Sequence, residues 1–316
     1  MRNTPKEWTL IDKIRHRVQR PNEHTVVPLG DDAFVFKNFP GYSVICQDMM
    51  VENVHFRLDY CSAEDLGYKA LAVNLSDVSA MGARPHFVQV SLALPKKLTE
   101  SWLDDFYKSM AQLADNTQCE IVGGDLTFSE DKLIIDVSVH GSCEKPLTRK
   151  GACVGDLLLS SGPLGLSYIG LLALQKNQPG FLAAKMKHRR PTPRLDLVPD
   201  LLERRFEVHA MMDCSDGLIN DGLRMLPADA GLVLFKENLP LHADTLEWAR
   251  LHHQDATDFV LWGGEDYELL IAISPDLYGH FSKWHLVGQF TEEKGVFLSD
   301  KHSKKEISEF KGWKHF

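Results

Sequence analysis

The order of its apolar segments is the feature that most constrains how this chain can fold. Three short runs, at 42–48, 86–94 and 133–140, are rich in aliphatic and β-branched residues and predict strands. A helical segment separates the first two runs, and strand-like and helical segments then follow one another without regular βαβ repetition. This order favours an α+β fold over a doubly wound parallel sheet.

Helix signals are strongest after residue 61. Ser62 suits the N-cap, Glu64 and Asp65 suit the positive end of the helix, and Gly82 followed by Pro85 predicts its end. The remaining predicted elements are a helix at 99–115, a strand at 157–161, a helix from about 165, a basic loop at 187–194, and strands near 208–213, 231–235 and 267–273.

The length of the chain predicts two lobes, because 316 residues are many for one hydrophobic core. The polar stretch 144–156 (EKPLTRKGACVGD) contains Gly and Pro and is a reasonable hinge. We therefore expect an N-terminal domain at 1–145 and a C-terminal domain at 146–316. The sequence contains no internal repeat and no low-complexity segment.

Composition narrows the class of protein. A formal charge of −9 argues against a general nucleic-acid binder, which needs a basic surface. The six cysteines lack the paired spacing of zinc sites, so reduced thiols are expected. The N-terminal segment has no apolar signal core, and no stretch approaches the roughly 18 apolar residues of a membrane span. We expect a cytoplasmic protein with no membrane partner.

Several aspartates share one kind of position, at the end of an apolar run or in a glycine-rich turn. Taken singly, each is explained by turn chemistry or helix capping. Asp77 adds a carboxylate on a helix face that it shares with Asn74, three residues away. The recurrence favours a common role for the set, which comprises Asp32, Asp48, Asp77, Asp125, Asp213 and Asp216.

If these carboxylates converge, they need cations. Two like charges about 4 Å apart repel by roughly 4 kcal/mol at an effective dielectric constant of about 20. Oxygen-only ligands select hard cations, and Mg²⁺ typically takes one or two carboxylates together with water and substrate phosphates. Convergence would therefore indicate several Mg²⁺ ions and a polyphosphate ligand.

The common nucleotide and hydrolase motifs are absent. The sequence contains no G-x-x-x-x-G-K-[ST] run, no G-x-S-x-G elbow and no H-E-x-x-H motif. The stretch 161–165 (SGPLG) follows a predicted strand but lacks the lysine and the glycine spacing of a phosphate loop, so we interpret it as a structural βα turn.

At this point the chain resembles a known family. Bacterial thiamine-monophosphate kinases are similar in motif order and spacing to GDDA (30–33), DMMVENVHF (48–56), GYKALAVNLSDVSAMGARP (67–85), IVGGD (121–125), LTRKGACVGD (147–156), RPTPR (190–194), DCSDGL (213–218) and GGEDYEL (263–269). The C-terminal stretch 311–316 also resembles the family's aromatic ending, so the match runs nearly end to end.

The resemblance implies a two-lobed α+β fold of the aminoimidazole-ribonucleotide-synthetase-like superfamily. The N-terminal lobe is expected to carry metal and ATP sites and to pair in a homodimer, and the C-terminal lobe to complete the active site. The implied reaction is direct in-line transfer of the γ-phosphoryl group of ATP to thiamine monophosphate, assisted by several Mg²⁺ ions. No dedicated nucleophile is expected, because phosphoryl transfer needs positioning and charge neutralisation.

The family's functional residues fall on definite positions of this sequence. All six aspartates match metal ligands, with Cys46 and Gln47 as further candidates through backbone or side chain. The implied ATP contacts are Tyr107, Gly124, Asp125, Arg149 and Ser215, and the implied thiamine-phosphate contacts are His55, Glu265 and Trp313. Trp313 suits a cationic thiazolium ring. Packing roles for Trp313 and His55, a turn role for Glu265 and a surface role for Arg149 remain open.

Two departures from the family pattern concern the metal and ATP sites. Cys46 and Gln47 stand where the family usually has Ser/Thr-Thr, and Leu126 and Phe128 interrupt the usual G-G-D-T-T-R. Two alternatives therefore stay open: another ATP-dependent enzyme of the superfamily, or a non-catalytic sensor of nucleotide or thiamine phosphate.

Overall fold

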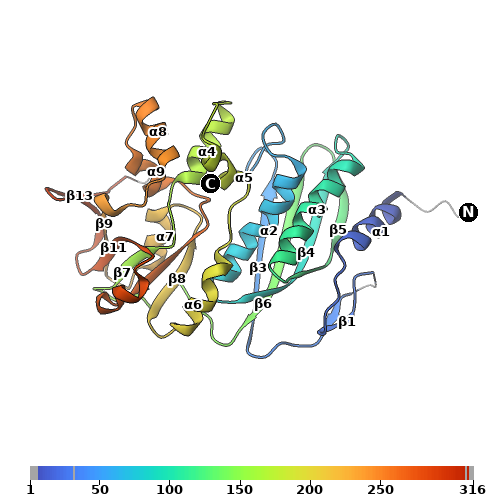
Figure 1. Ribbon diagram of the computed structural model, residues 1–316, viewed down its shortest axis with the longest axis horizontal. Helices are drawn as coiled ribbons and strands as arrows, with labels where there is room; N and C mark the ends of the chain where they lie inside the picture. Colours follow the sequence, from blue (N-terminus) through green and yellow to red (C-terminus); the bar gives the residue numbers. More distant parts are fainter. Residues whose placement is uncertain (1–5, 31–32, 310–311, 313–316) are drawn as a thin grey trace, which may run out of the picture. The chain divides into compact units, whose positions relative to one another are not determined.

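The computed structural model describes residues 6–30, 33–309 and 312, and the chain forms two compact units. Unit 1 comprises residues 1–78 and 83–146, and unit 2 comprises residues 79–82 and 147–316 (Figure 1). Each unit combines a β-sheet with helices, which confirms the predicted α+β class. Among the described residues, no helix has the length and apolarity needed to cross a membrane.

Unit 1 is built on a four-stranded sheet in the order β3-β6-β4-β5. The β3/β6 and β4/β6 pairs are antiparallel, and β4/β5 is parallel. Helices α2 and α3 cover one face of this sheet (Figure 1). The elements are α1 (Lys6–Val18), β1 (Thr25–Val27), β2 (Val35–Phe36), β3 (Tyr42–Val51), α2 (Ala63–Ala80), β4 (Arg84–Pro95), α3 (Glu100–Asn116), β5 (Glu120–Ser129) and β6 (Ile134–Cys143).

The two predicted helices of unit 1 are confirmed, and side chains fix where they begin. Ser62 Oγ accepts from the Asp65 N–H at 3.1 Å, and the Asp65 carboxylate accepts from the Ser62 N–H, a reciprocal capping box. Thr99 caps α3 through its hydroxyl oxygen, which accepts from the Trp102 N–H. The helices pack closely at Gly67, where a Cβ would lie 2.0 Å from the Phe106 carbonyl oxygen.

Unit 2 contains a seven-stranded sheet in the order β13-β12-β9-β11-β7-β10-β8, in which only the β9/β12 pair is parallel among the described strands. Its elements are β7 (Leu157–Ser160), α4 (Leu166–Gln175), α5 (Leu182–Arg189), η1 (Arg194–Leu197), α6 (Val198–Glu203), β8 (Val208–Cys214), α7 (Leu218–Met225), β9 (Gly231–Phe235), η2 (Lys236–Asn238), α8 (Ala243–His252), α9 (Ala256–Trp262), β10 (Glu268–Ile273), η3 (Pro275–Phe281), β11 (His285–Thr291), β12 (Gly295–Ser299) and β13 (Lys304–Glu306).

Both faces of the unit 2 sheet are buried at β7, β9 and β10, whereas the edge strand β13 is exposed. Alternate residues of β10, such as Leu270 and Leu269, enter different apolar clusters, because successive side chains of a strand point to opposite faces. Helices α7 and α9 contribute to the cluster of Leu270, and α6 contributes to that of Leu269. This two-sided burial explains why β7, β9 and β10 consist almost entirely of apolar residues.

Two predictions about local structure were wrong. Residues 187–189 of the predicted basic loop form the last turn of α5, where cations suit the negative end of a helix. Asp48 and Asp125 were expected at strand ends, but β3 continues to Val51 and β5 to Ser129. The apolar run stops earlier than the strand because parts of β3 and β5 are exposed.

An aromatic cluster ties the segment after β2 to β4 in unit 1. The ring of His86 stacks on Phe39 with centroids 3.6 Å apart, and its Nε2 lies 2.7 Å from Ser142 Oγ. Phe39 also contacts the rings of His24 and Phe87. Burial, followed by the charges of His24 and Arg84, lowers the pKa of His86 to about 4.

This cluster predicts an acid-sensitive unit 1. Because the folded pKa of His86 lies below that of an unfolded histidine, the unfolded chain binds more protons between about pH 6.5 and 4. The neutral His86 ring makes its full contribution to the free energy of unfolding above pH 6.5, and this contribution is lost as the pH falls toward 4. We expect His86→Gln to lessen this loss by about 1–2 kcal/mol, allowing for the partial exposure of the ring. Urea unfolding of the unmodified chain and of His86→Gln at several pH values measures the loss of unfolding free energy. If the free energies of the two proteins fell in parallel with pH, His86 would not be its cause.

Candidate functional site

In unit 1, Asp48 lies on strand β3, on the face of the strand that contacts α2. The Cys46 thiol, two residues before it on the same face of the strand, donates to the carbonyl oxygen of Asn74 in α2 at 3.3 Å. Burial, and secondly the charge of Asp136, raises the pKa of Asp48. Asp77 follows Asn74 by one helical turn and is partly buried. This face of β3 therefore meets the polar face of α2.

Gln47 points to the opposite face of β3 and donates to Asp136 on the neighbouring strand, with Nε2 and Oδ2 2.6 Å apart. The sheet register pairs Asp136 with Ser91, and Ser91 with Asp125. Asp125 and Asp136 are thus two strand spacings apart, about 10 Å. Asp136 was missed by sequence reasoning, because it lies within an alternating strand rather than beside a glycine.

The backbone conformation at position 124 requires glycine. Gly124 has φ of 146°, and a Cβ there would lie 1.8 Å from the carbonyl oxygen of Val90. No other residue fits this approach without moving β4. The chain can therefore present the exposed Asp125 from a strand that lies unusually close to its neighbour.

In unit 2, two turns lie side by side at the end of β8. Asp213 is 7% exposed, and the turn 215–217 follows it directly. The Glu265 N–H donates to the Ser215 carbonyl oxygen at 2.8 Å, and the Tyr267 N–H donates to that of Cys214 at 2.9 Å. Two predicted groups, the DCSDGL and GGEDYEL segments, thus form one local structure.

The second turn is held in a strained conformation. Glu265 and Tyr267 have φ of 64° and 53°, in the left-handed region that residues other than glycine seldom occupy. His188 Nδ1 lies 3.2 Å from Glu265 Oε2 and 3.2 Å from Ser167 Oγ, which orients the glutamate. Backbone strain of this kind concentrates at functional sites, since it persists only where neighbouring contacts enforce it.

Asp216 belongs to a charged network with two residues of α7. Arg224 forms ion pairs with Asp216 at 2.6 Å and with the fully buried Asp221 at 2.9 Å. The Asp221 carboxylate also accepts from the Asp216 N–H at 2.9 Å. Burial, together with the charges of Asp213 and Asp216, raises the pKa of Asp221 to about 7, although the Asp216 N–H and Arg224 oppose the shift. Negative charge therefore accumulates around Asp213.

Asp266, between the two strained residues, is completely buried. Its carboxylate accepts from the N–H groups of Gly165 and Ser167 and so caps α4. Burial raises the pKa of Asp266 to about 7, although Lys187 and these two N–H groups oppose the shift. The predicted structural role of the turn 161–165 is thus accounted for, since Asp266 supplies the cap that Gly165 cannot.

Glu268, two residues after Asp266, forms ion pairs with two basic side chains, Lys187 and Arg194. Lys187 Nζ and Arg194 Nη1 each lie 2.5 Å from its carboxylate oxygens, and Ser161 Oγ donates to it at 2.6 Å. Burial pushes the pKa of Glu268 upward, but the two cations and Ser161 outweigh burial and lower it. Lys187 and Arg194 thereby anchor the α5 end to the start of β10.

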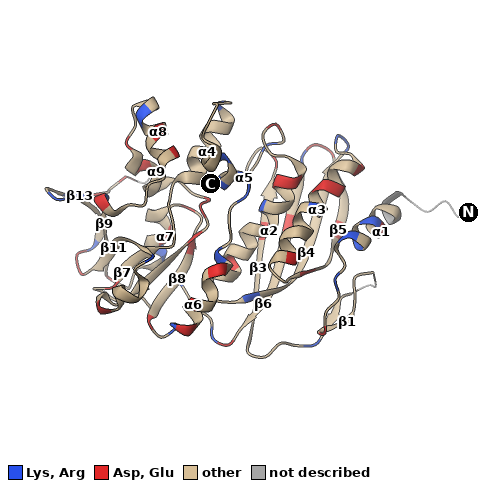
Figure 2. Cartoon of the chain, in the orientation of Figure 1, with Lys and Arg blue, Asp and Glu red and all other residues tan. Residues whose placement is uncertain are grey.

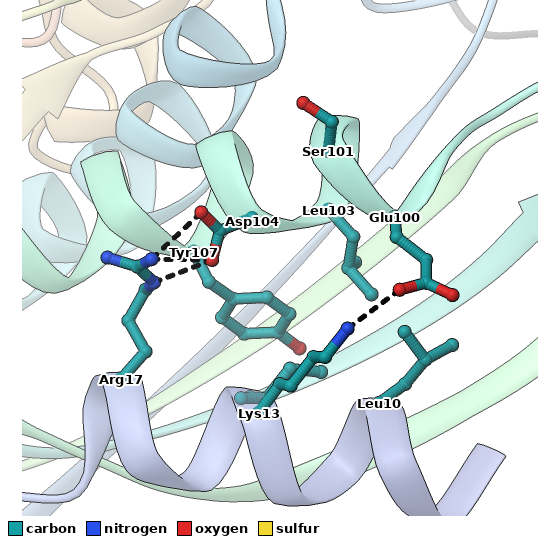
Figure 3. A pocket seen from close by; sticks show the side chains of 9 residues that line it. Leu10, Lys13, Arg17, Glu100, Ser101, Leu103, Asp104 and Tyr107 are labelled. Carbon is teal, nitrogen blue, oxygen red and sulfur yellow. Dashed lines mark hydrogen bonds and ion pairs between the residues drawn. The ribbon is translucent and has the colours of Figure 1, made fainter. Parts of the chain in front are cut away.

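Tyr107 lines a cavity of about 390 Å³ between α1 and α3 in unit 1 (Figure 3). Two ion pairs span these helices: Lys13 with Glu100 at 2.8 Å, and a bidentate pair of Arg17 with Asp104 at 2.8 Å. Figure 2 shows the basic positions of α1 and the acidic positions of α3. Burial raises the pKa of the Tyr107 hydroxyl, which therefore stays protonated.

His55 and Arg149 are set by their backbone surroundings. His55 Nδ1 accepts from the Val51 N–H at 3.0 Å, so the ring proton resides on Nε2. Arg149 is exposed on a segment whose Thr148 carbonyl oxygen accepts from the Met211 N–H of β8. Asp32 and Trp313 lie outside the described residues.

Four residues of these networks were missed by sequence reasoning: the buried Asp221 and Asp266, the partly buried Lys187 and the exposed Arg224. One signal was present for Asp221: it falls on the apolar face of α7, beside Leu218, Gly222 and Met225, where an unpaired carboxylate is costly.

Comparison with known proteins connects these sites to named relatives. The model of the AIR synthase related protein, N-terminal domain, matches residues 30–143, and that of the C-terminal domain matches residues 154–310. The thiamine-monophosphate kinase of Bacillus subtilis (strain 168) is 35% identical over 98% of this chain and 99% of its own length. That of Aquifex aeolicus (strain VF5) is 33% identical over 98% of each chain.

A solved structure of AaThiL complexed with AMPPCP and TMP superimposes with a TM-score of 0.79. It is 30% identical and covers 98% of this chain and 97% of its own. The two matched domain models meet near the boundary between units 1 and 2.

Proposed function

Since the chain belongs to the thiamine-monophosphate kinase family, we propose that it transfers the γ-phosphoryl group of ATP to thiamine monophosphate and releases thiamine diphosphate. A full-length match at 35% identity supports the same reaction in this chain. The structure of a relative bound to AMPPCP and TMP supports ATP and thiamine monophosphate as the two substrates.

One observation carries the proposal: the contact between the turn of Asp213, Ser215 and Asp216 and the turn of Glu265. The first turn offers carboxylates and a hydroxyl, and the second holds a glutamate in a strained, oriented conformation. A sensor would need affinity alone, whereas strain held beside clustered carboxylates suits a site that positions reacting groups.

The donor sets fit Mg²⁺. The proposed ligands are carboxylate oxygens, which Mg²⁺ prefers. Burial and, secondly, the charge of Asp136 raise the pKa of Asp48, and burial together with Asp213 and Asp216 raises the pKa of Asp221. We assign Asp48, Asp77 and Asp125 of unit 1 and Asp213 and Asp216 of unit 2 as ligands, with Asp32 added by the family match. Bound Mg²⁺ would neutralise phosphate charge on donor and acceptor. Gln47 donates to Asp136 on the opposite face of β3, whereas Cys46 shares a strand face with Asp48.

The remaining proposed residues position the substrates. His55 can donate from Nε2 to an anionic phosphate because its Nδ1 is an acceptor. Arg149 offers a planar guanidinium, and Ser215 a hydroxyl, for ATP phosphates. Glu265 and Trp313 are proposed to contact the thiamine half. None of these groups needs to act as a nucleophile, since the acceptor phosphate is already an anion.

Tyr107 provides a test of nucleotide binding. We expect Tyr107→Ala to raise the KM for ATP about tenfold, since stacking of a base on an aromatic ring is worth roughly 1–3 kcal/mol. The KM for thiamine monophosphate should change little. Tyr107→Phe is the matched control, because it keeps the ring and loses only the hydroxyl. Initial-rate measurements with each substrate varied decide this, and equal changes in both constants would return Tyr107 to a packing role.

The reaction itself is tested with the purified protein, ATP, Mg²⁺ and thiamine monophosphate. Formation of thiamine diphosphate supports the kinase. Binding of thiamine monophosphate without turnover supports the alternative of a non-catalytic sensor. Turnover only with formylglycinamidine ribonucleotide supports the other alternative, an ATP-dependent enzyme of the same superfamily, in this case aminoimidazole ribonucleotide synthetase. Chelation of Mg²⁺ with EDTA should abolish the kinase rate and leave the fold intact.

We also propose a homodimer formed through unit 1, with the protein in the cytoplasm. The sheet face opposite α2 and α3 exposes Ile45 (64%) and Met49 (56%), apolar residues that a second copy would cover. We propose that residues 1–145 supply metal ligands, ATP contacts and the dimer interface, and that residues 146–316 supply the remaining metal ligands and substrate contacts. Analytical ultracentrifugation of Ile45→Asp tests the interface: the variant should sediment as a monomer, and an unchanged dimer would contradict this interface.

A further inference from the structure

A cluster of three potential metal ligands lies in unit 2 at the other end of β8 from Asp213. It consists of Cys153, Asp156 and His209, whose ligand atoms all lie within 4.8 Å of one another. His209 precedes Asp213 by four residues of β8, roughly 13 Å. The cluster is therefore separate from the residues assigned to phosphoryl transfer.

The backbone holds the three residues in place. The Asp156 N–H donates to the Cys153 carbonyl oxygen at 3.1 Å, and the Cys153 N–H donates to Asp156 Oδ2 at 2.7 Å, which closes a turn. The Gly155 N–H donates to the Phe290 carbonyl oxygen, and the Phe290 N–H donates to that of Asp156, which fastens this turn to β11. His209 lies on β8, whose residue Met211 donates its N–H to the Thr148 carbonyl oxygen of the same segment.

Asp156 also orients the histidine. Its Oδ2 lies 2.8 Å from His209 Nδ1, and the carboxylate is almost fully buried. With the Nδ1 proton donated to Asp156, the lone pair of Nε2 is available to a metal, the usual arrangement of a histidine ligand supported by a carboxylate. Cys153 is exposed, and its thiol donates only a long contact to the Gly151 carbonyl oxygen at 3.7 Å.

We propose that Cys153 and His209, supported or joined by Asp156, bind one Zn²⁺ or a cation of similar softness. A thiolate with an imidazole selects Zn²⁺ over Mg²⁺, which prefers oxygen ligands. A ring nitrogen of His209 lies within 4.8 Å of Cys153 Sγ, and a tetrahedral zinc site brings sulfur and nitrogen to within about 4 Å of each other. With at most three protein ligands, water completes the coordination. Binding joins the 148–156 segment, which carries Arg149, to β8.

Co²⁺ titration of the full-length protein tests the site in excess Mg²⁺, which keeps the oxygen sites occupied. We expect one equivalent of Co²⁺ to produce a thiolate-to-cobalt charge-transfer band that Zn²⁺ abolishes. Cys153→Ser should remove the band, and His209→Gln should weaken Co²⁺ binding at least about tenfold. His302→Gln, which changes an exposed histidine outside the cluster, is the matched control and should behave as the unmodified chain.

A second measurement needs no variant. Zn²⁺ should slow alkylation of Cys153 by iodoacetamide at least about tenfold, read by peptide mass spectrometry, because a coordinated thiolate is shielded. Neither measurement depends on kinase turnover, so the site can fail while the proposed reaction stands. A titration without the band, a band that survives Cys153→Ser, or an alkylation rate indifferent to Zn²⁺ would each overturn the proposal and leave Asp156 and His209 as a structural pair.

Discussion

Replacing Asp213 with Asn lowers kcat by at least about 100-fold while the chain keeps its fold. Asp213 is 7% exposed at the end of β8, beside Asp221 and Asp216. Losing a preorganised charge that acts on the transition state typically costs a factor of about 10²–10³. We expect the chain to stay folded, because Asn matches the shape of Asp and removes one of the charges that raise the pKa of Asp221.

The measurement is kcat for thiamine diphosphate formation at saturating substrates, with the Mg²⁺ concentration varied. Extra Mg²⁺ should restore part of the lost rate if Asp213 is a ligand. Asp258→Asn, an exposed residue of α9, is the control and should leave both the rate and the Mg²⁺ requirement unchanged. A normal rate in Asp213→Asn would remove this residue from the metal site.

Replacing Glu268 with Gln lowers the free energy of unfolding by about 3 kcal/mol. The carboxylate of Glu268 is the shared partner of Lys187 and Arg194, whose side chains are only 12% and 18% exposed. The amide would remove the anion that Lys187 and Arg194 share and leave Arg194 its pair with Asp196, and breaking a buried pair costs about 3–5 kcal/mol. We take the lower end because both cations retain some contact with water.

Urea unfolding measures this difference, and Glu247→Gln is the matched control. Glu247 pairs with Arg250 on the surface of α8, where both side chains are exposed, so its loss should leave the unfolding midpoint unchanged. Equal midpoints for the two variants would show that the Glu268 network contributes no more than a surface pair.

Local structure was predictable wherever a short segment contains its own physical cause. The start of α2 followed from Ser62 and the acidic residues after it, and the capping box confirms it. The ends of β3 and β5 were not predictable in this way. A strand ends where its hydrogen-bonded ladder ends, whereas the apolar run ends where burial ends, and on partly exposed strands the two positions differ.

In the candidate site too, some residues were identified from local motifs, whereas others were identified only from tertiary contacts. The family motifs predict roles for Asp48, Asp213 and Glu265, and the structure shows that the Ser215 and Glu265 turns contact each other. Motif spacing could not find Asp136, whose role depends on a cross-strand hydrogen bond to Gln47, a residue 89 positions away. Nor could it assign Lys187 to Glu268, since that pairing exists only once α5 packs beside β10.

By itself, the amino-acid sequence determined the α+β class, the starts of α2, α3 and α4, and the family, because these depend on local pattern and motif order. Only the tertiary structure decided which carboxylates share a network, which cations are already neutralised, and how Cys153 and Asp156 meet His209. The physical reason is range: capping and periodicity act over a few residues, whereas ion pairs and coordination need side chains brought together from distant parts of the chain.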